Sequence, residues 1–319
     1  MKIVSLFSGA GGMDLGFEQA GFEIIQANEY DKHIWKTYRK NFSNTYLEKE
    51  SIVKIKNFPE ADGLIGGPPC QSWSVAGSKR GINDSRGQLF FDFIRALKQI
   101  KPKFFVAENV QGILSKRNEP ALKQIIKMFE EAGYIVSYKL LNAKDYNIAQ
   151  DRKRVFFVGF RKKNFVFPEP LKKTIVLKDI IYDLRDNVVE PIDNTYHNEN
   201  CLVSNHEYFK GGFSSIFLSR NRVRAWDEVS FTIQATARHI PLHPQAPKMI
   251  LLGKDKRGFV PEKEKLYRRL SIRECARIQS FPDQFEFLYD NLIHGYKMVG
   301  NAVPPELARV IAEEIKKQA

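Results

Sequence analysis

Apolar and polar residues alternate along the first half of the chain so that short strand-like runs are followed by longer helix-like segments. Runs rich in β-branched and aromatic residues indicate strands, and apolar residues three or four positions apart indicate helices. The predicted strands span residues 2–7, 23–27, 63–65, 103–107, 135–141 and 154–160, and the predicted helices span residues 13–20, 32–41, 89–100 and 119–132. This alternation predicts an α/β fold whose largely parallel sheet binds ligands at the carboxyl ends of its strands.

The pattern changes near residue 165, where prolines and polar residues replace the helical period. We therefore predict a large domain made of residues 1–184 and 290–319, and a smaller, irregular domain made of residues 185–289. In the smaller domain, Ser271 and Glu274 have capping-box spacing and predict the start of a helix. The amphipathic tail predicts a last helix that packs back on the large domain.

Composition is that of an ordinary soluble protein, with 319 residues of which 43% are hydrophobic and 27% are charged. No apolar run is long enough to cross a bilayer, and the amino terminus lacks the features of a signal peptide. We therefore expect a cytoplasmic protein without a membrane partner. The three cysteines and six histidines lack metal-ligand spacing, so no metal is expected.

Positive charge is distributed unevenly along the chain, whose net charge is +13. Residues 210–275 contain 14 Lys and Arg against 6 Asp and Glu, so +8 of this charge falls within one stretch. Clustered Lys and Arg are typical of proteins that bind a phosphate-bearing partner, although a solvated basic face has the same composition.

A glycine-rich turn, FSGAGG at residues 7–12, links the first predicted strand to the first predicted helix. Such a turn lets a ligand approach the backbone closely. Glu29 follows about 20 positions later, where a carboxylate suits ribose hydroxyls, and the ring of the adjacent Tyr30 could stack on adenine. The pattern predicts an adenosine-containing cofactor, and its GxGG spacing disfavours a nicotinamide dinucleotide.

Cys70 stands in GGPPCQSWS, residues 66–74, at the end of a predicted strand. Two prolines fix the backbone before it, and polar residues follow it. A free cysteine is most often a small buried hydrophobic residue, but this setting favours an accessible thiol that could act as a nucleophile.

Three more places carry candidate chemistry. Glu108 follows an apolar strand, and Arg152 and Arg154 enter another strand two positions apart, where they would share a face and could hold a phosphate or a carbonyl oxygen. A loop carboxylate and a surface pair are the structural alternatives. Residues 295–305 predict a tight turn before the last helix, with Asn301 available to a ligand.

The strings FSGAGG, GGPPCQSWS, AENV, QDRKRVFF and GNAVPP occur in this order between residues 7 and 305. Together they resemble the DNA (cytosine-5) methyltransferases of bacterial restriction–modification systems. The resemblance implies a Rossmann-like S-adenosylmethionine-dependent methyltransferase sheet with one antiparallel edge strand, and a smaller target-recognition domain. It also implies a monomer that binds double-stranded DNA and acts beside a separate cognate endonuclease.

The resemblance also implies a mechanism on a cytosine flipped out of the duplex. The Cys70 thiolate would add to carbon 6, Glu108 would bond the ring nitrogen and amino group, and Arg154 would hold the carbonyl. Arg152 would support the cysteine side of the pocket, and Gln71 is counted with the catalytic residues.

Binding residues carry over by position. The cofactor would contact the turn, the second strand end and a few further positions: Phe7, Gly9, Ala10, Gly11, Gly12, Glu29, Tyr30, Glu50, Pro69, Leu89 and Asn301. DNA would contact the arginines of a closing loop over residues 71–87 and of the small domain: Arg80, Arg220, Arg222, Arg224 and Arg238. Residues 219–224 and 232–238 resemble the subgroup that methylates the inner cytosine of GGCC, with Arg220, Arg222 and Arg238 reading guanines.

Three alternative functions share some of these features. A nicotinamide-dependent oxidoreductase shares the glycine turn, but it needs neither Pro-Pro-Cys-Gln nor a basic second domain. A tRNA cytosine-5 methyltransferase of the same superfamily shares the chemistry, and a DNA-binding protein that has lost catalysis shares the basic domain.

Overall fold

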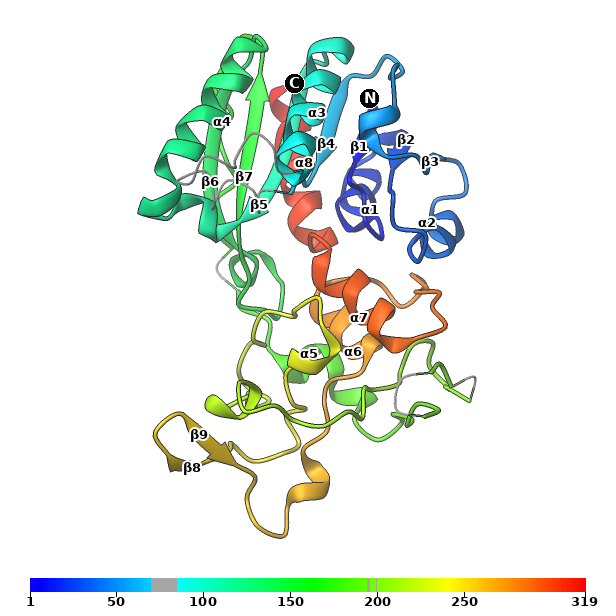
Figure 1. Cartoon of the computed structure of the whole chain (residues 1–319), viewed down its shortest axis with the longest axis vertical. Coiled ribbons are helices and arrows are strands. Elements are labelled where there is room, and N and C mark those ends of the chain that lie inside the picture. Colours follow the sequence, from blue (N-terminus) through cyan, green and yellow to red (C-terminus); the bar gives the residue numbers. More distant parts are fainter. Residues whose placement is uncertain (70–84, 172, 194–195, 199) are drawn as a thin grey trace. The chain divides into compact units, whose positions relative to one another are not determined.

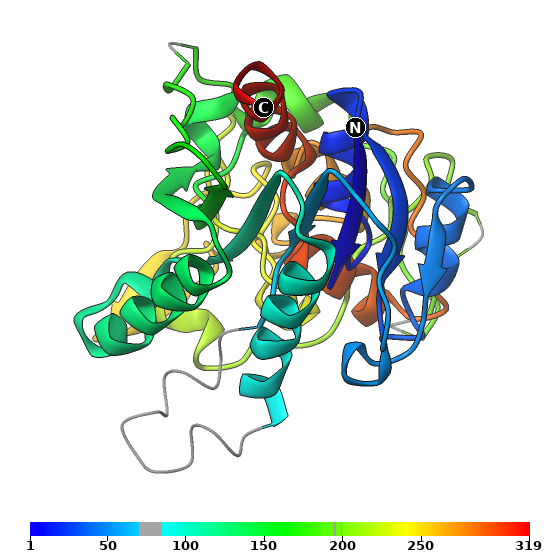
Figure 2. The same cartoon turned by 90° about the horizontal axis from the view of Figure 1, so that it is seen from above.

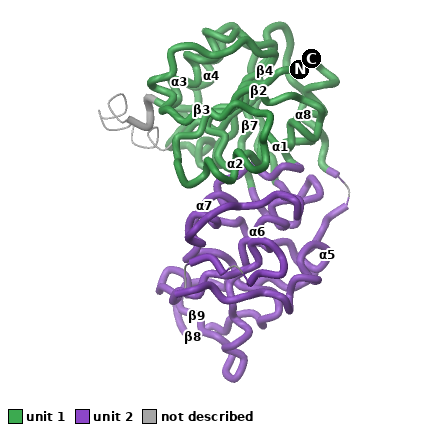
Figure 3. The backbone as a smooth tube through the Cα atoms, turned by 90° about the vertical axis from the view of Figure 1, so that its right-hand side faces the viewer, with its two compact units in different colours: residues 1–142, 153–170, 307–319 green, residues 143–152, 171–306 purple. Residues whose placement is uncertain are grey.

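The chain folds into two compact units (Figure 3). A computed structural model describes residues 1–69, 85–171, 173–193, 196–198 and 200–319, with the backbone alone for residues 85–88. The first unit contains residues 1–142, 153–170 and 307–319, and the second contains residues 143–152 and 171–306.

The boundaries of these units differ from those of the predicted domains, since residues 143–152, 171–184 and 290–306 lie in the second unit. Backbone bonds account for the first of these segments, because Ser230 N–H donates to Ala149 O at 2.8 Å and Asp151 N–H donates to Ser230 O at 2.9 Å. The sequence of so short a segment does not show which of the two units it packs in.

A seven-stranded mixed sheet forms the first unit, which confirms the predicted α/β fold (Figure 1). Its order is β3-β2-β1-β4-β5-β7-β6. The strands are β1 (Lys2–Leu6), β2 (Glu23–Asn28), β3 (Tyr46–Glu48), β4 (Gly63–Gly66), β5 (Phe104–Val110), β6 (Ile135–Asn142) and β7 (Lys153–Phe160).

All neighbouring strands are parallel except at β7, which runs antiparallel to both β5 and β6. The expected antiparallel strand is therefore present, but its predicted place at the edge is wrong. β6 precedes β7 in the chain and pairs on its outer side, so the reversed strand is second from the edge.

Helices cover both faces of this sheet. They are α1 (Gly12–Gln19), α2 (Trp35–Asn41), α3 (Ser85–Ile100), α4 (Glu119–Glu131) and α8 (Pro305–Gln318). Figure 2 shows α3 and α4 on one side of the sheet and α8 on the other. Successive side chains of β5 point to opposite faces of the sheet. The Phe105 ring stacks on Phe129 of α4, with ring centroids 4.2 Å apart, and the Phe104 ring contacts Phe22, with centroids 5.9 Å apart. Lys316 of α8 donates to Ala20 O at 3.0 Å, so the tail returns to the first unit as predicted.

The second unit contains α5 (Leu177–Ile181), α6 (Ile272–Ile278), α7 (Leu292–Asn301) and a hairpin of β8 (Ile250–Gly253) and β9 (Lys256–Gly258). The predicted capping box is present, because Ser271 and Glu274 each accept a bond from the other's backbone N–H. The Glu274 carboxylate also accepts two 2.7 Å bonds from Arg268. Burial disfavours the charge of Glu274, but Arg268 outweighs it and lowers the pKa to about 2.

The tight turn predicted over residues 295–305 is wrong for its first part, which belongs to α7. The Asn291 side chain caps this helix by accepting from Ile293 N–H at 2.9 Å. Gly300 suggested a turn, but it lies in α7 and lets the helix backbone pack closely against Gln234. A Cβ at this position would lie 2.3 Å from Gln234 O.

Candidate functional site

The glycine turn after β1 and the acid after β2 come together. Phe7 and Gly9 both have a φ of 56°, and Gly9 N–H donates to one carboxylate oxygen of Glu29 at 2.9 Å. The other oxygen accepts from Asp31 N–H at 2.7 Å. Gly11 has a φ of 90°, and a Cβ there would lie 2.2 Å from the Phe42 ring, so a larger residue would strain the backbone and displace that ring.

Space remains over this turn. Among the residues that the structure describes, no heavy atom other than those of its own chain neighbours lies within 4 Å of a Cβ built on Gly9. The adjacent residues Ala10 and Gly12 are buried, whereas Tyr30 is 71% exposed. Open backbone beside a fixed carboxylate and an accessible ring fits an adenosine-bearing ligand.

Asn28, which the sequence analysis missed, holds the neighbouring segment. Its side-chain amide donates to Glu48 O at 3.1 Å and to Glu50 O at 2.8 Å. The Glu50 side chain is exposed and pairs with Lys54 at 3.2 Å. Asn28 could have been identified from the sequence, because it is a polar residue at the carboxyl end of an apolar strand.

Asp14 lies fully buried in the first turn of α1 and was also missed. Its carboxylate accepts from Ser5 Oγ at 2.6 Å and from Tyr38 OH at 2.6 Å, and so ties α1 to β1 and α2. Burial raises the pKa of Asp14 to about 6, although both hydrogen bonds act in the opposite direction.

Glu108 and Arg154 form an ion pair at 2.9 Å, with side chains only 13% and 15% exposed. Strand register explains the contact, because Val110 lies opposite Arg154 and Glu108 lies opposite Phe156. Residues on this diagonal share a face and are within reach of long side chains. The predicted carboxylate and guanidinium are therefore brought together. β5 continues two residues beyond Glu108, so the carboxylate lies inside the strand and not after it.

The segment after β4 runs beside this pair. Asn109 donates to Pro68 O at 3.1 Å, and a Cβ on Gly67 would lie 3.3 Å from a carboxylate oxygen of Glu108. Pro69 is the last residue described here, and Cys70, Gln71 and Arg80 lie outside the described residues. Asn109 was missed, although its place next to Glu108 on a strand could have indicated it.

Two further cofactor candidates, Phe7 and Leu89, pack against the same apolar core cluster of the first unit. Asn301 belongs to the second unit, where it is the last residue of α7 and is exposed.

Arg152 is buried in the second unit and donates to three backbone oxygens. They are Ile233 O at 3.0 Å, Gly300 O at 2.9 Å and Ala302 O at 2.9 Å. Arg152 precedes β7 instead of lying in it, so strand alternation does not place it on a face with Arg154. Its contacts fix the backbone of the second unit.

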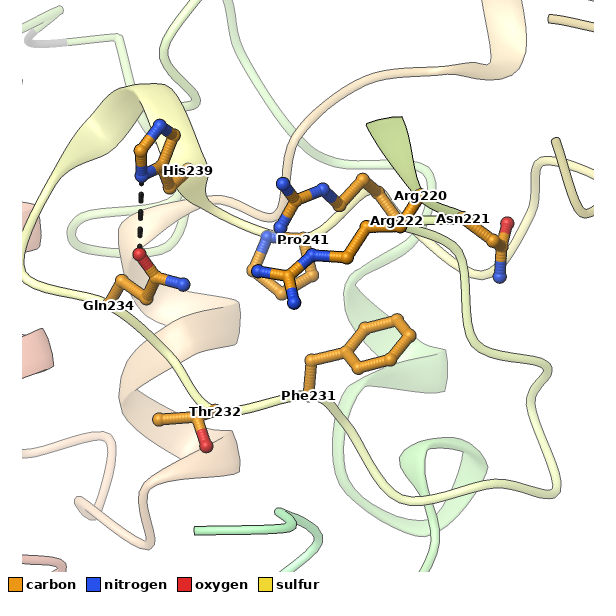
Figure 4. Close-up of a pocket in the computed structure, with 8 residues that line it drawn as sticks. All are labelled: Arg220, Asn221, Arg222, Phe231, Thr232, Gln234, His239 and Pro241. Carbon is orange, nitrogen blue, oxygen red and sulfur yellow. Dashed lines mark hydrogen bonds between the residues drawn. The ribbon is translucent and has the colours of Figure 1, made fainter. Parts of the chain in front are cut away.

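Four of the five predicted DNA-binding arginines, Arg220, Arg222, Arg224 and Arg238, lie in the second unit, where a cavity of about 240 Å³ is present. Figure 4 shows the residues that line it: Arg220, Asn221, Arg222, Phe231, Thr232, Gln234, His239 and Pro241. Arg220 is exposed, and Arg222 donates to Phe217 O at 2.8 Å and to Ile216 O at 3.0 Å.

Arg224 and Arg238 are not among the lining residues. Arg224 pairs with Glu228 at 3.1 Å and lies over the Phe231 ring, whereas Arg238 is exposed. The structure therefore brings Arg220 and Arg222 together at one cavity. Gln234 and His239, whose side chains approach to 3.3 Å, were missed as lining residues.

Comparisons with known proteins agree over the whole chain. Residues 1–317 match the model of the C-5 cytosine-specific DNA methylase family. The chain is 61% identical to the type II methyltransferase M.FnuDI of Fusobacterium nucleatum, over 99% of this chain and 94% of the relative. It is 56% identical to the type II methyltransferase M.NgoPII of Neisseria gonorrhoeae, over 99% and 96% respectively.

A crystal structure described as a prophage-encoded DNA modification methyltransferase (E. coli) has the same fold. Its TM-score is 0.76 at 24% identity, with 99% of each chain covered. In the part of the chain that the structure describes, no helix has both the length and the apolar character needed to cross a membrane.

These matches decide between the activities that the motifs left open, and members of this family take a methyl group from S-adenosylmethionine. The chain belongs to the C-5 cytosine-specific DNA methylases, and it is a cytosine-C5 DNA methyltransferase of the type II restriction–modification kind.

Proposed function

We propose that the enzyme methylates the inner cytosine of duplex GGCC through a covalent adduct with Cys70. The observation that carries the chemistry is the Glu108–Arg154 ion pair beside the Gly67-Pro68 backbone, two residues before Cys70. It supports a pocket in which a carboxylate, a guanidinium and a thiol meet one pyrimidine ring.

The target cytosine must leave the duplex, because its ring carbons are inaccessible inside the base stack. The Cys70 thiolate then forms a bond to carbon 6, and the displaced electron pair makes carbon 5 nucleophilic. Glu108 bonds the ring nitrogen and amino group, and Arg154 holds the carbonyl oxygen, so that both stabilise charge as the adduct forms.

S-adenosylmethionine supplies an electrophilic methyl group on its sulfonium sulfur. When this cofactor is bound, carbon 5 would take the methyl group, and S-adenosylhomocysteine would leave with the sulfur electron pair. A base then takes the carbon 5 proton, and the electrons of that bond re-form the ring double bond and expel the Cys70 thiolate.

The cofactor residues are proposed from the turn and the two strand ends described above. Glu29 would bond the ribose, and Tyr30 would stack on adenine. Phe7 would face the adenine, and Leu89 would line the pocket. The remaining positions are assigned by resemblance: Gly9, Ala10, Gly11, Gly12, Glu50, Pro69 and Asn301.

Target recognition is proposed for the second unit. Arg220, Arg222 and Arg238 would read guanines, Arg224 and Arg80 would contact the DNA backbone, and the cavity beside Arg220 and Arg222 supports this assignment. The enzyme would act as a monomer in the bacterial cytoplasm and protect host DNA from a separate cognate endonuclease.

Expression in a host without cytosine methylation, followed by genome-wide mapping of 5-methylcytosine, tests the target. We expect methylation concentrated at the inner cytosine of GGCC. Methylation concentrated at another sequence would contradict the proposed target and leave the chemistry intact.

Substitution of the thiol tests the covalent step. Cys70→Ala should abolish methyl transfer while DNA and S-adenosylmethionine still bind, and Cys201→Ala, at a partly exposed thiol of the second unit, serves as the control. A duplex with 5-fluorocytosine at the target should trap the wild-type protein covalently, since fluorine cannot leave as a proton does. Methyl transfer by Cys70→Ala would refute the role of Cys70.

A further inference from the structure

The β8–β9 hairpin exposes an unusual apolar strand. It lies at the end of the second unit away from α7 (Figure 1), and all four residues of β8 are exposed. Leu251 is 66% exposed and Leu252 is 57% exposed, next to Ile250. Three consecutive apolar residues on the surface of a soluble protein indicate a surface that a partner covers.

Charge around the hairpin indicates what kind of partner this is. Residues 248–258 contain four basic side chains and one acidic side chain. Within the described part of the chain, Lys254 and Lys256 at the hairpin turn make no ion pair. Unpaired cations beside an apolar strand are complementary to DNA. Its phosphates are negatively charged, and its sugars present apolar surface.

The root of the hairpin is fixed to the segment that carries the proposed guanine readers. Met249 is buried, and its N–H donates to Asn221 Oδ1 at 3.0 Å. Asn221 lies between Arg220 and Arg222 in the chain, and all three line the cavity. Arg257 closes the root by donating to Met249 O at 3.3 Å. DNA bound by Arg220 and Arg222 would therefore lie near the hairpin, whose root is held by these hydrogen bonds.

The register of the hairpin disfavours a protein partner that adds a strand. Leu251 pairs with Arg257 and Gly253 pairs with Lys256, so Leu252 is an extra residue that interrupts the ladder. A bulge of this kind bends a strand and blunts its edge against pairing with another chain.

We infer that the β8–β9 hairpin is a second DNA contact that binds the duplex outside the recognised base pairs. Lys254 and Lys256 contact phosphates, and Leu251 and Leu252 pack against the sugars of one groove. The inference rests on the proposed function, because that function places DNA at Arg220 and Arg222.

The salt dependence of DNA affinity tests the charged part. In Lys254→Ala/Lys256→Ala, the slope of log affinity against log salt should become shallower by about 2, since each lost phosphate contact contributes roughly 0.9. Lys123→Ala/Lys127→Ala removes two exposed charges from α4 and should keep the wild-type slope. An unchanged slope in the hairpin variant overturns the inference.

Duplex length tests the apolar part. Wild type should bind more tightly when the duplex extends about one helical turn, roughly 10 base pairs, beyond the target on each side. Leu251→Ser/Leu252→Ser should lose this gain and keep the wild-type sequence preference. If the substitutions instead dissociate an oligomer in sedimentation and leave the flank effect intact, the surface joins two copies and the inference is wrong.

Failure of the proposed function has a different signature. A wild-type protein without GGCC-dependent transfer contradicts the target proposal, but its salt slope can still be compared with that of the hairpin variant. If the wild-type protein methylates GGCC, but its DNA affinity depends on salt with the same slope as that of Lys254→Ala/Lys256→Ala, then the hairpin inference alone is contradicted.

Discussion

Glu108 offers the most direct test of the proposed chemistry at the scale of single residues. Glu108→Gln keeps the shape of the side chain but removes the charge that pairs with Arg154. We expect single-turnover methyl transfer to slow by roughly 10²–10³-fold, a range typical of losing one electrostatic stabiliser, with DNA affinity retained. Glu119→Gln, on the exposed start of α4, should transfer at the wild-type rate. Equal rates for both variants would remove Glu108 from the mechanism.

Asp14 predicts a pH-dependent term in stability. Its pKa rises from 3.8 to about 6 in the folded protein, so the native state keeps a proton that the unfolded chain releases. The unfolding free energy should therefore fall as pH rises from about 4 through 6, by at most about 3 kcal/mol.

Urea unfolding of wild type and Asp14→Asn across this range measures that term. The wild-type free energy should fall relative to that of Asp14→Asn as pH rises, because the amide does not titrate. Asp255→Asn, at an exposed turn position with positive φ, is the control and should follow wild type. Parallel curves for wild type and Asp14→Asn would show that Asp14 ionises as it does in the unfolded chain.

Arginines show what sequence can and cannot settle at this scale. Glu108 and Arg154 could each be predicted as site candidates from residue type and strand position, but their ion pair depends on the register between β5 and β7. Arg152 and Arg222 carry the same chemistry, yet both are buried and donate to backbone carbonyls. A guanidinium fits a carbonyl, a phosphate or a guanine equally well, so residue type alone does not choose among them.

At the scale of elements, α7 depends on one close approach. In Gly300→Ala, the new methyl group would lie 2.3 Å from Gln234 O, within the second unit. We expect a loss of about 1–3 kcal/mol in unfolding free energy, the usual effect of overpacking. Gly212→Ala meets no described atom within 4 Å and should change stability little. Thermal unfolding of both variants measures the difference, and equal midpoints would mean that α7 shifts freely.

The predictability of each element follows its length and its alternation. Six of the seven strands of the large sheet and the long helices were predicted because buried apolar runs alternate with amphipathic segments. β3 has three residues, too few for a periodic signal, and α7 contains two glycines that suggested a turn. The hairpin was missed because exposed apolar residues and basic residues do not alternate as in a half-buried strand.

At the scale of the whole molecule, the cofactor should stabilise the fold. S-adenosylhomocysteine at about 100 times its Kd should add about 2.7 kcal/mol to the unfolding free energy. Glu29→Gln should lose most of this gain because it removes the carboxylate proposed to bind the ribose. Glu23→Gln, at the opposite end of β2, should keep it. A full gain in Glu29→Gln, measured by thermal shift, would place the ribose elsewhere.

The path of the chain between the units has a practical consequence for exchanging, among relatives, the target recognition proposed for the second unit. The second unit is assembled from two separate stretches, residues 143–152 and 171–306. Thr232 Oγ1 donates to Asp151 O at 2.6 Å, and Arg152 donates to Ile233 O, so hydrogen bonds join the short stretch to the long one. A chimera that transplants only the long stretch would set foreign carbonyls against Arg152. A functional chimera therefore has to take both residues 143–152 and residues 171–306 from the same protein.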